Sequence, residues 1–329
     1  MANAAFSPKD FKAWAIEETT TGTPITSSMF QLDVDSVAMP SLNVNQNLDV
    51  RTSIGRVLHA NDFFQDNEIR ATEVSLSGTY HNDAGHILLM QSACGNSLQS
   101  SVADVIIPTA STTSSGKYGT SANDLTFTLV LAPPDTDDGY NIVMPGCLCT
   151  NFSISADTGT DGGIYKWSAT ISSGQNPVTD NTATESGTVY SSSPISITTL
   201  TGATTINSIA STVLSSFSVT VDSPAVYSGF SATGYAAFAR GAELAVTCAA
   251  QVKYDSVTRP LLNNFNTQTA HDAADFFTMT QATANDCSVA IGSGVLTNVA
   301  LSEGDIMMLD VEGKAVNVGN AILTFDLAA

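Results

Sequence analysis

The chain has 329 residues, with 11 Lys or Arg against 31 Asp or Glu, so its formal net charge is −20. This charge disfavours tight binding to a phosphate backbone, which depends on Lys and Arg releasing counterions, and it equally disfavours anionic lipid surfaces. Hydrophobic residues make up 43% of the chain, enough for a folded core. No run of about 18 apolar residues occurs, and no secretory signal pattern is visible, so we expect neither a membrane-spanning helix nor secretion.

Cysteine usage gives a second constraint. Five cysteines, an odd number, occur at unrelated spacings, which predicts buried, reduced thiols in a cytoplasmic environment rather than a disulfide framework. They are Cys94, Cys147, Cys149, Cys248 and Cys287.

Along the chain, apolar and polar residues alternate with a period of two, the pattern of strands with one buried face. Val, Ile, Thr and aromatic residues, which suit a half-buried pleated surface, fill these stretches. In chain order, the predicted strands are residues 30–35, 74–80, 127–131, 152–156, 165–171, 217–221, 244–254 and 322–327.

Helical signals are few. Residues 83–93 form a candidate helix with Asn82 or Asp83 as the N-cap and Gly95 just beyond its end. Residues 256–265 form a second one, with Asp255 as the N-cap. Residues 110–123 and 172–193 read as long polar loops, and we interpret the second as a linker.

The two halves of the chain match each other. Residues 30–36 align with 217–223, and the strand, aspartate and helix of residues 74–90 align with those of 246–262. We interpret this as a duplicated β-rich domain with one short helix per copy, divided into residues 1–180 and 181–329. The alternative is that strand–turn–helix pieces recur by chance in a β-rich chain.

No catalytic signature is found: the sequence lacks a phosphate-binding loop, an H-E-x-x-H zinc motif and a nucleophile elbow. His81, Asp83 and His86 could suggest a metal, but they straddle a strand end and a helix cap, without the i, i+4 spacing of a ligand pair. Cys147 and Cys149 lack a second ligand pair. We therefore predict no catalytic residue, no metal site and no cofactor.

Two acidic loops, residues 135–139 and 157–163, resemble the opening of a calcium loop but lack its bidentate Glu. Since Asp and Gly are ordinary hairpin residues, we favour turns. Basic residues are concentrated in the first quarter of the chain. They either contact other copies of the chain or are scattered, solvated surface charges. They are Lys9, Lys12, Arg51, Arg56 and Arg70.

Several segments together resemble the major tail tube protein of long, non-contractile bacteriophage tails, in the form with two tube domains in one chain. They are Ile16-Glu17-Glu18-Thr19-Thr20-Thr21-Gly22-Thr23-Pro24, the strand of residues 30–36, the strand–Asp83–helix unit, Met144-Pro145-Gly146 before residues 151–156, and the matching second-half strand and strand–Asp255–helix unit.

The resemblance implies mainly β domains, each a sandwich or open barrel with a short flanking helix, whose hairpins pair with those of neighbouring copies. Three chains would complete a pseudo-sixfold ring, and stacked rings would form a hollow conduit for double-stranded DNA. The implied partners are further copies of the chain and the tape-measure, tail terminator and distal tail proteins. The implied location is the virion tail, assembled in the host cytoplasm without a cofactor.

A lumen lined by carboxylates would repel DNA phosphates, and we expect Asp33, Asp35 and Asp222 to face it. Two other classes stay open: a capsid decoration or other β-rich virion protein, and a carbohydrate-binding adhesive sandwich. The latter would need clustered aromatic residues, yet Trp14 and Trp167 are the only tryptophans and are far apart in sequence. An enzyme is the class with least support.

Overall fold

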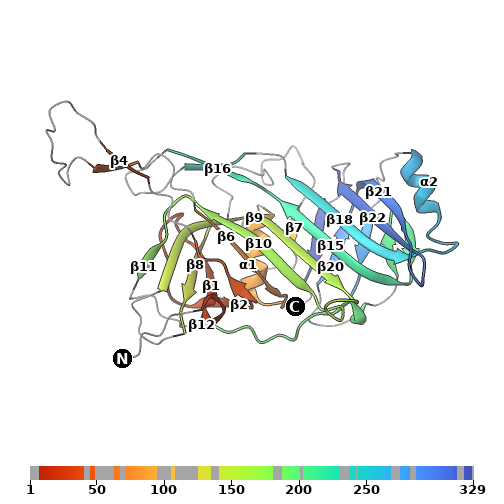
Figure 1. Cartoon of the computed structure of the whole chain (residues 1–329), viewed down its shortest axis with the longest axis horizontal. Helices are drawn as coiled ribbons and strands as arrows, with labels where there is room; N and C mark the ends of the chain where they lie inside the picture. Colours follow the sequence, from red (N-terminus) through yellow and green to blue (C-terminus); the bar gives the residue numbers. More distant parts are fainter. Residues whose placement is uncertain are drawn as a thin grey trace.

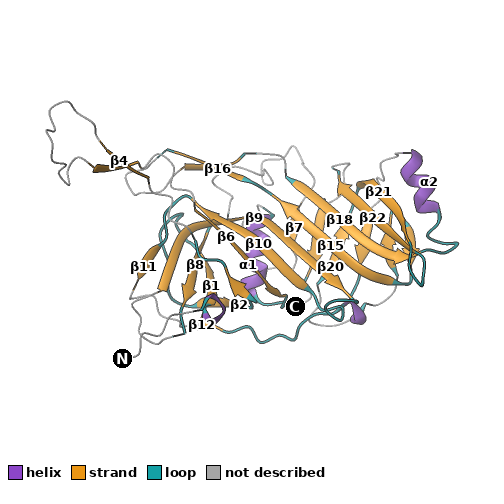
Figure 2. Ribbon diagram, viewed as in Figure 1, coloured by secondary structure: helices purple, strands orange, loops and turns teal. Residues whose placement is uncertain are grey.

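The computed structural model describes residues 7–40, 45–48, 63–66, 72–94, 105–107, 125–134, 141–180, 187–200, 203–229, 237–241, 244–267, 275–281, 287–316 and 322–327. Within these residues the fold is mainly β, with several sheets and two α-helices, α1 (Ala84–Ala93) and α2 (Pro260–Thr267) (Figures 1 and 2). The predicted mainly β fold, consistent with a β-sandwich, is confirmed.

The largest sheet has 13 strands, and we call the part of it that runs along the long axis of the molecule the long sheet (Figure 1). Each neighbouring pair in it is antiparallel. Its order is β3 (Ser36–Val37), β6 (Thr72–Thr79), β10 (Lys166–Ser173), β9 (Asn141–Asp157), β15 (Leu214–Asp222), β18 (Ala245–Lys253), β22 (Met308–Ala315) and β21 (Gly294–Ser302).

Two further groups of strands lie beside the long sheet: the first continues the same 13-stranded sheet through β9, and the second is a separate six-stranded sheet. At Gly146, whose φ of +62° suits glycine, β9 passes from pairing with β8 to pairing with β10. The first group is β12 (Gly187–Thr188), β2 (Met29–Leu32), β1 (Lys12–Glu17), β8 (Phe127–Ala132), the start of β9, and β11 (Val178–Asp180). The second is β14 (Ile209–Ser211), β13 (Thr204–Ile206), β19 (Phe277–Met279), β20 (Ser288–Ile291), β23 (Leu323–Asp326) and β7 (Val105–Ile107).

The remaining elements are two hairpins and two short 3₁₀ helices. The hairpins are β4 (Asn45–Leu48) with β5 (Phe63–Asp66), and β16 (Ala225–Ser228) with β17 (Ala237–Arg240). The 3₁₀ helices are η1 (Pro8–Asp10) and η3 (Ile197–Thr199). One extended apolar cluster spans both halves of the chain, because buried residues from each contribute to it.

The strand pairings follow the same order in both halves. In the first half, β3 pairs with β6, β6 with β10 and β10 with β9; in the second half, β15 pairs with β18, β18 with β22 and β22 with β21. A helix follows β6 and β18, and a hairpin precedes each of them. The register also slips at one threonine in each half, Thr150 of β9 and Thr297 of β21, which are 147 positions apart.

This order corrects one sequence match. Residues 30–36 do not take the same place as 217–223, because β2 pairs with β1 and β12, whereas β15 pairs with β9 and β18. The pairings place Ser36 in the position of Ser216, an offset of 180 rather than 187. Alternation is the same on every half-buried strand, so it cannot identify the neighbours of a strand. The second match keeps its order, but β6 ends at Thr79 and β18 at Lys253, an offset of 174 rather than 172.

Most predicted elements are observed near their expected bounds, with three corrections. Strand β2 ends at Leu32, so residues 33–35 are not part of it, and α2 begins at Pro260 rather than at residue 256. Residues 172–193 are not one loop, since they include the end of β10, β11 and β12. The predicted loop of residues 110–123 and the acidic loop of residues 135–139 lie outside the described residues.

Residues 157–163 form the predicted turn, between β9 and β10. The Asp157 carboxylate accepts a hydrogen bond from the backbone N–H of Gly159 at 2.6 Å, and its carbonyl accepts from the N–H of Asp161 and Gly163. Gly162 and Gly163 have φ of +63° and +80°. The glycines are therefore required by the left-handed backbone of the turn.

Candidate functional site

One face of the long sheet carries mainly short polar and charged side chains; we call it the polar face. Successive side chains on a strand point to opposite faces, and here the buried apolar positions alternate with exposed or half-buried ones. Acidic residues outnumber basic ones on its six central strands, from β6 to β22. The charged residues are Glu73, Asp157, Asp222, Asp310 and Glu312 against Lys166, Lys253 and Lys314.

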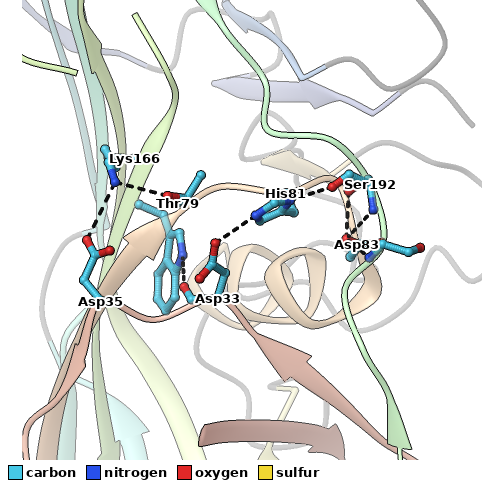
Figure 3. Close-up of polar contacts among 9 residues, drawn as sticks. Asp33, Asp35, Thr79, His81, Asp83, Lys166 and Ser192 are labelled. Carbon is cyan, nitrogen blue, oxygen red and sulfur yellow. Dashed lines mark hydrogen bonds and ion pairs between the residues drawn. The ribbon is translucent and has the colours of Figure 1, made fainter. Parts of the chain in front are cut away.

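The three predicted lumen residues separate into two groups. Asp222 is exposed on the polar face at the end of β15. Asp35 lies at the edge of the same face, with its Oδ2 3.7 Å from Nζ of Lys166 and a side chain 62% exposed (Figure 3). Asp33 is different, because its carbonyl oxygen accepts a hydrogen bond from Trp167 Nε1 at 3.0 Å. Trp167 follows Lys166 directly in β10, so its side chain points to the opposite, buried face of the sheet.

The Asp33 carboxylate belongs to a polar cluster on the core side of the sheet (Figure 3). His81 Nε2 lies 2.9 Å from Asp33 Oδ2, and His81 Nδ1 lies 2.7 Å from the carbonyl oxygen of Ser192. Asp83 Oδ2 accepts from Ser192 Oγ at 2.7 Å and from the N–H groups of Ser191 and Ser192. The cluster therefore fastens the segment between β12 and η3 to the β6–α1 connection.

The predicted helix caps behave differently from each other. Asp83 occupies the N-cap position of α1, but its side chain makes no capping hydrogen bond. Asp255 Oδ1 accepts from the N–H groups of Val257 and Thr258 at 2.8 and 3.1 Å, which lowers the pKa of this carboxyl group. Asp255 thus closes the turn that precedes α2.

The five cysteines are free and buried, as predicted. Burial raises the pKa of Cys149 and of Cys248 to about 12, so these thiols stay protonated at neutral pH. Because the thiolate is the reactive and metal-binding form, these two side chains act as packing groups. Among the described residues, no group of three or more His, Cys, Asp or Glu side chains is placed to hold a metal ion.

His86 makes the stability of the chain depend on pH. It is fully buried between Tyr80 and Trp167, and neither ring nitrogen has a hydrogen-bond partner among the described residues. Burial, with a smaller contribution from His81, lowers its pKa from 6.5 to about 3. The folded state therefore holds a neutral ring, whereas the unfolded chain takes up a proton below pH 6.5.

We expect unfolding free energy to be unaffected by His86 above pH 6.5 and to fall by about 1.4 kcal/mol per pH unit between pH 6.5 and 4. Urea unfolding of the unassembled chain at several pH values measures this slope. His86→Phe keeps an aromatic ring but cannot titrate, so its slope should be smaller by that amount. Equal slopes for the two proteins would contradict the assignment.

Two charged residues, one buried and one half-buried, were not singled out from sequence. Glu18, 7% exposed, accepts from Thr128 Oγ1 at 2.8 Å and from the N–H groups of Gly146 at 2.7 Å and Gly22 at 2.8 Å. It thereby joins the segment of residues 16–24 to Met144-Pro145-Gly146, two of the segments that carry the sequence resemblance. A buried carboxylate requires such hydrogen-bond donors. No local pattern in the sequence identifies donors such as Thr128 and Gly146, which lie more than 100 positions from Glu18.

The second is Arg240, at the end of the β16–β17 hairpin. Its Nη1 donates to the carbonyl oxygens of Cys149 and Ser223, and its Nη2 donates to that of Ser92 at 2.7 Å. Tyr227 of the same hairpin lies within hydrogen-bonding distance of Ser172 Oγ, at 2.9 Å. The hairpin from the second half is therefore fixed on the first half.

The family model of phage tail tube proteins matches residues 12–315. The matched span begins with the first residue of β1 and ends with the last residue of β22. This chain belongs to the phage tail tube protein family. Membership identifies a structural protein of the bacteriophage virion, located in the tail. No curated protein matches the sequence. Among the described residues, no helix is both long and apolar enough to cross a membrane.

Proposed function

We propose that this tail tube protein forms the hollow tube of a long, non-contractile phage tail, with three chains in each ring and rings stacked along the tail. The observation that carries the proposal is the long sheet, which has one polar face and, among the described residues, no strand beyond β3 or β21. Closing such sheets side by side removes their edges and produces a barrel. The role is structural and not enzymatic.

We further propose that each chain contributes two tube domains, residues 1–180 and 181–329. Support comes from the strand pairings, which follow the same order in the two halves. The boundary falls directly after β11. Three chains would thus place six similar domains around the tube axis.

The polar face would line the lumen. Asp35 and Asp222 would lie there together with the other acidic residues of this face, whereas Asp33 would remain bound to His81. An excess of carboxylates repels DNA phosphates, so the duplex passes during delivery without binding. The tape-measure, tail terminator and distal tail proteins would complete the assembly, which takes place in the host cytoplasm.

Electron microscopy of the purified chain tests the proposal. Hollow tubes or stacked rings with three chains per ring, counted by native mass spectrometry, are the expected result. Compact trimers or monomers under conditions that allow polymerisation would instead indicate a capsid decoration protein and overturn the proposal.

A further inference from the structure

We propose that β21 of one chain pairs in antiparallel fashion with residues 36–40 of the next copy, in the register already seen inside each chain between β9 and β15. We call this contact the seam. The inference rests on the proposed function, because it specifies which edges join the copies in a ring. It is tested by identifying which residues pair between two chains, and that result does not depend on whether tubes form.

The internal contact between β9 and β15 supplies the template. Residues 151–157 of β9 lie opposite residues 216–222 of β15, with Ile154 facing Val219. Both of these side chains are fully buried. This pair is also where the first half of the long sheet meets the second half, so it shows how two copies of the repeated strand set join.

The repeated order converts this template into a register between chains. Strand β21 takes the position of β9, with Thr297 equivalent to Thr150, and β3 takes the position of β15, with Ser36 equivalent to Ser216. By these offsets Leu301 is equivalent to Ile154, and Met39 is equivalent to Val219. The seam therefore places Leu301 of one chain opposite Met39 of the next.

Exposure at the two edges supports this pairing. Leu301 is 46% exposed and Met39 is 39% exposed, whereas their internal equivalents are both 0% exposed. Leu301 lies on the edge strand β21, and Met39 follows the edge strand β3 by two residues, so neither is covered by a further strand among the described residues. A second copy of the chain brings them together as one apolar pair.

A neighbouring position supports the pairing from one of its two sides. Tyr165, two residues from the turn after β9, is fully buried and packs edge-to-face on Phe217 of β15, with ring centroids 5.0 Å apart. The equivalent of Tyr165 before β22 is Met307, which is 44% exposed. The equivalent of Phe217 is Val37 of β3. In the seam, Met307 would lie beside Val37 of the next copy; Val37 is already buried in its own chain, so Met307 is the side chain that gains cover.

The main chain at both edges is suited to the contact. Among the described residues, β21 pairs only with β22 and β3 pairs only with β6. Pro40, the last residue of the segment, would lie opposite Ala300; it has no N–H to donate, so the hydrogen-bond ladder of the seam ends there. The contact is head-to-tail. Repeating it closes a ring when a whole number of chains, each rotated by the same angle from the last, completes a full turn.

Disulfide cross-linking tests the register. The double variant Met39→Cys/Leu301→Cys places two sulfurs at directly opposed positions, where Cα atoms are about 4.5–5.5 Å apart and a disulfide can form. The control Met39→Cys/Glu303→Cys places them diagonally, about 7–8 Å apart, beyond disulfide reach. The native cysteines are buried, and wild-type protein measures their background.

After mild oxidation, non-reducing electrophoresis should show covalent oligomers for Met39→Cys/Leu301→Cys only, with the largest species at the ring size. A monomer-sized product, or equal cross-linking of the diagonal control, would overturn the seam. Electron microscopy of the same samples separates the two proposals. Tubes without cross-links would refute the seam alone, whereas cross-linked rings that never stack would refute the tube and leave the seam.

Discussion

Leu301→Glu is expected to leave the chain folded but unable to form rings. Leu301 is 46% exposed in the single chain, so an acidic side chain there stays hydrated and folding is little affected. In the seam, the carboxylate would be buried against Met39 without a partner, which costs several kcal/mol per contact. Sedimentation velocity should show monomers at concentrations where the wild-type chain assembles, with an unchanged thermal melting profile.

Two further variants make this result specific. Val257→Glu changes an apolar side chain that is 54% exposed in the turn before α2, outside the proposed seam, and should assemble as wild type does. Combining Leu301→Glu with Met39→Lys pairs opposite charges across the seam and should restore part of the assembly. Normal rings from Leu301→Glu, or no rescue by the second substitution, would contradict the proposed register.

Glu18→Ala is expected to lower the unfolding free energy by about 3–5 kcal/mol, because it removes three hydrogen bonds to a charged group and leaves buried donors unpaired. Two of those donors, Thr128 Oγ1 and the N–H of Gly146, are buried where β9 passes from pairing with β8 to pairing with β10. Urea unfolding of the unassembled chain measures the loss.

Glu17→Ala is the matched control. Glu17 precedes Glu18 at the end of β1 and is only half-buried, and partial burial raises the pKa of its carboxyl group. Its removal should change the unfolding free energy by no more than about 0.5 kcal/mol, as is usual for surface substitutions. Similar losses for the two variants would show that the three hydrogen bonds of Glu18 are not the cause.

The polar cluster around His81 shows how a local pattern can be found in sequence and its role missed. Capping rules correctly placed Asp83 at the start of a helix. The rules contain no information about Ser191 and Ser192, which come more than 100 positions later and take up the carboxylate instead. Whether a carboxylate accepts hydrogen bonds from local or from distant donors is decided only when the chain is folded.

Asp33 illustrates the limit of period-two reasoning. Alternation would place Asp33 and Asp35 on the same face of a strand. The backbone between β2 and β3 is not a regular strand, so Asp35 reaches Lys166 on the polar face while Asp33 turns to His81 on the core side. Periodicity applies only where the ladder of hydrogen bonds is continuous.

By itself, the sequence determined that the chain is rich in half-buried strands, that two short helices follow matching strands, and that its cysteines are buried thiols. These features depend on residues close together in the chain and on composition, and both can be read from the sequence. The tertiary structure decided which strands are neighbours and hence the offsets at which the pairing order repeats. It also decided the partners of Glu18 and Arg240 and the edges near which Met39 and Leu301 are exposed. Strand pairing joins residues that are far apart in the chain. The alternation of side chains along one strand is the same whichever strand pairs with it, so it does not identify the partner.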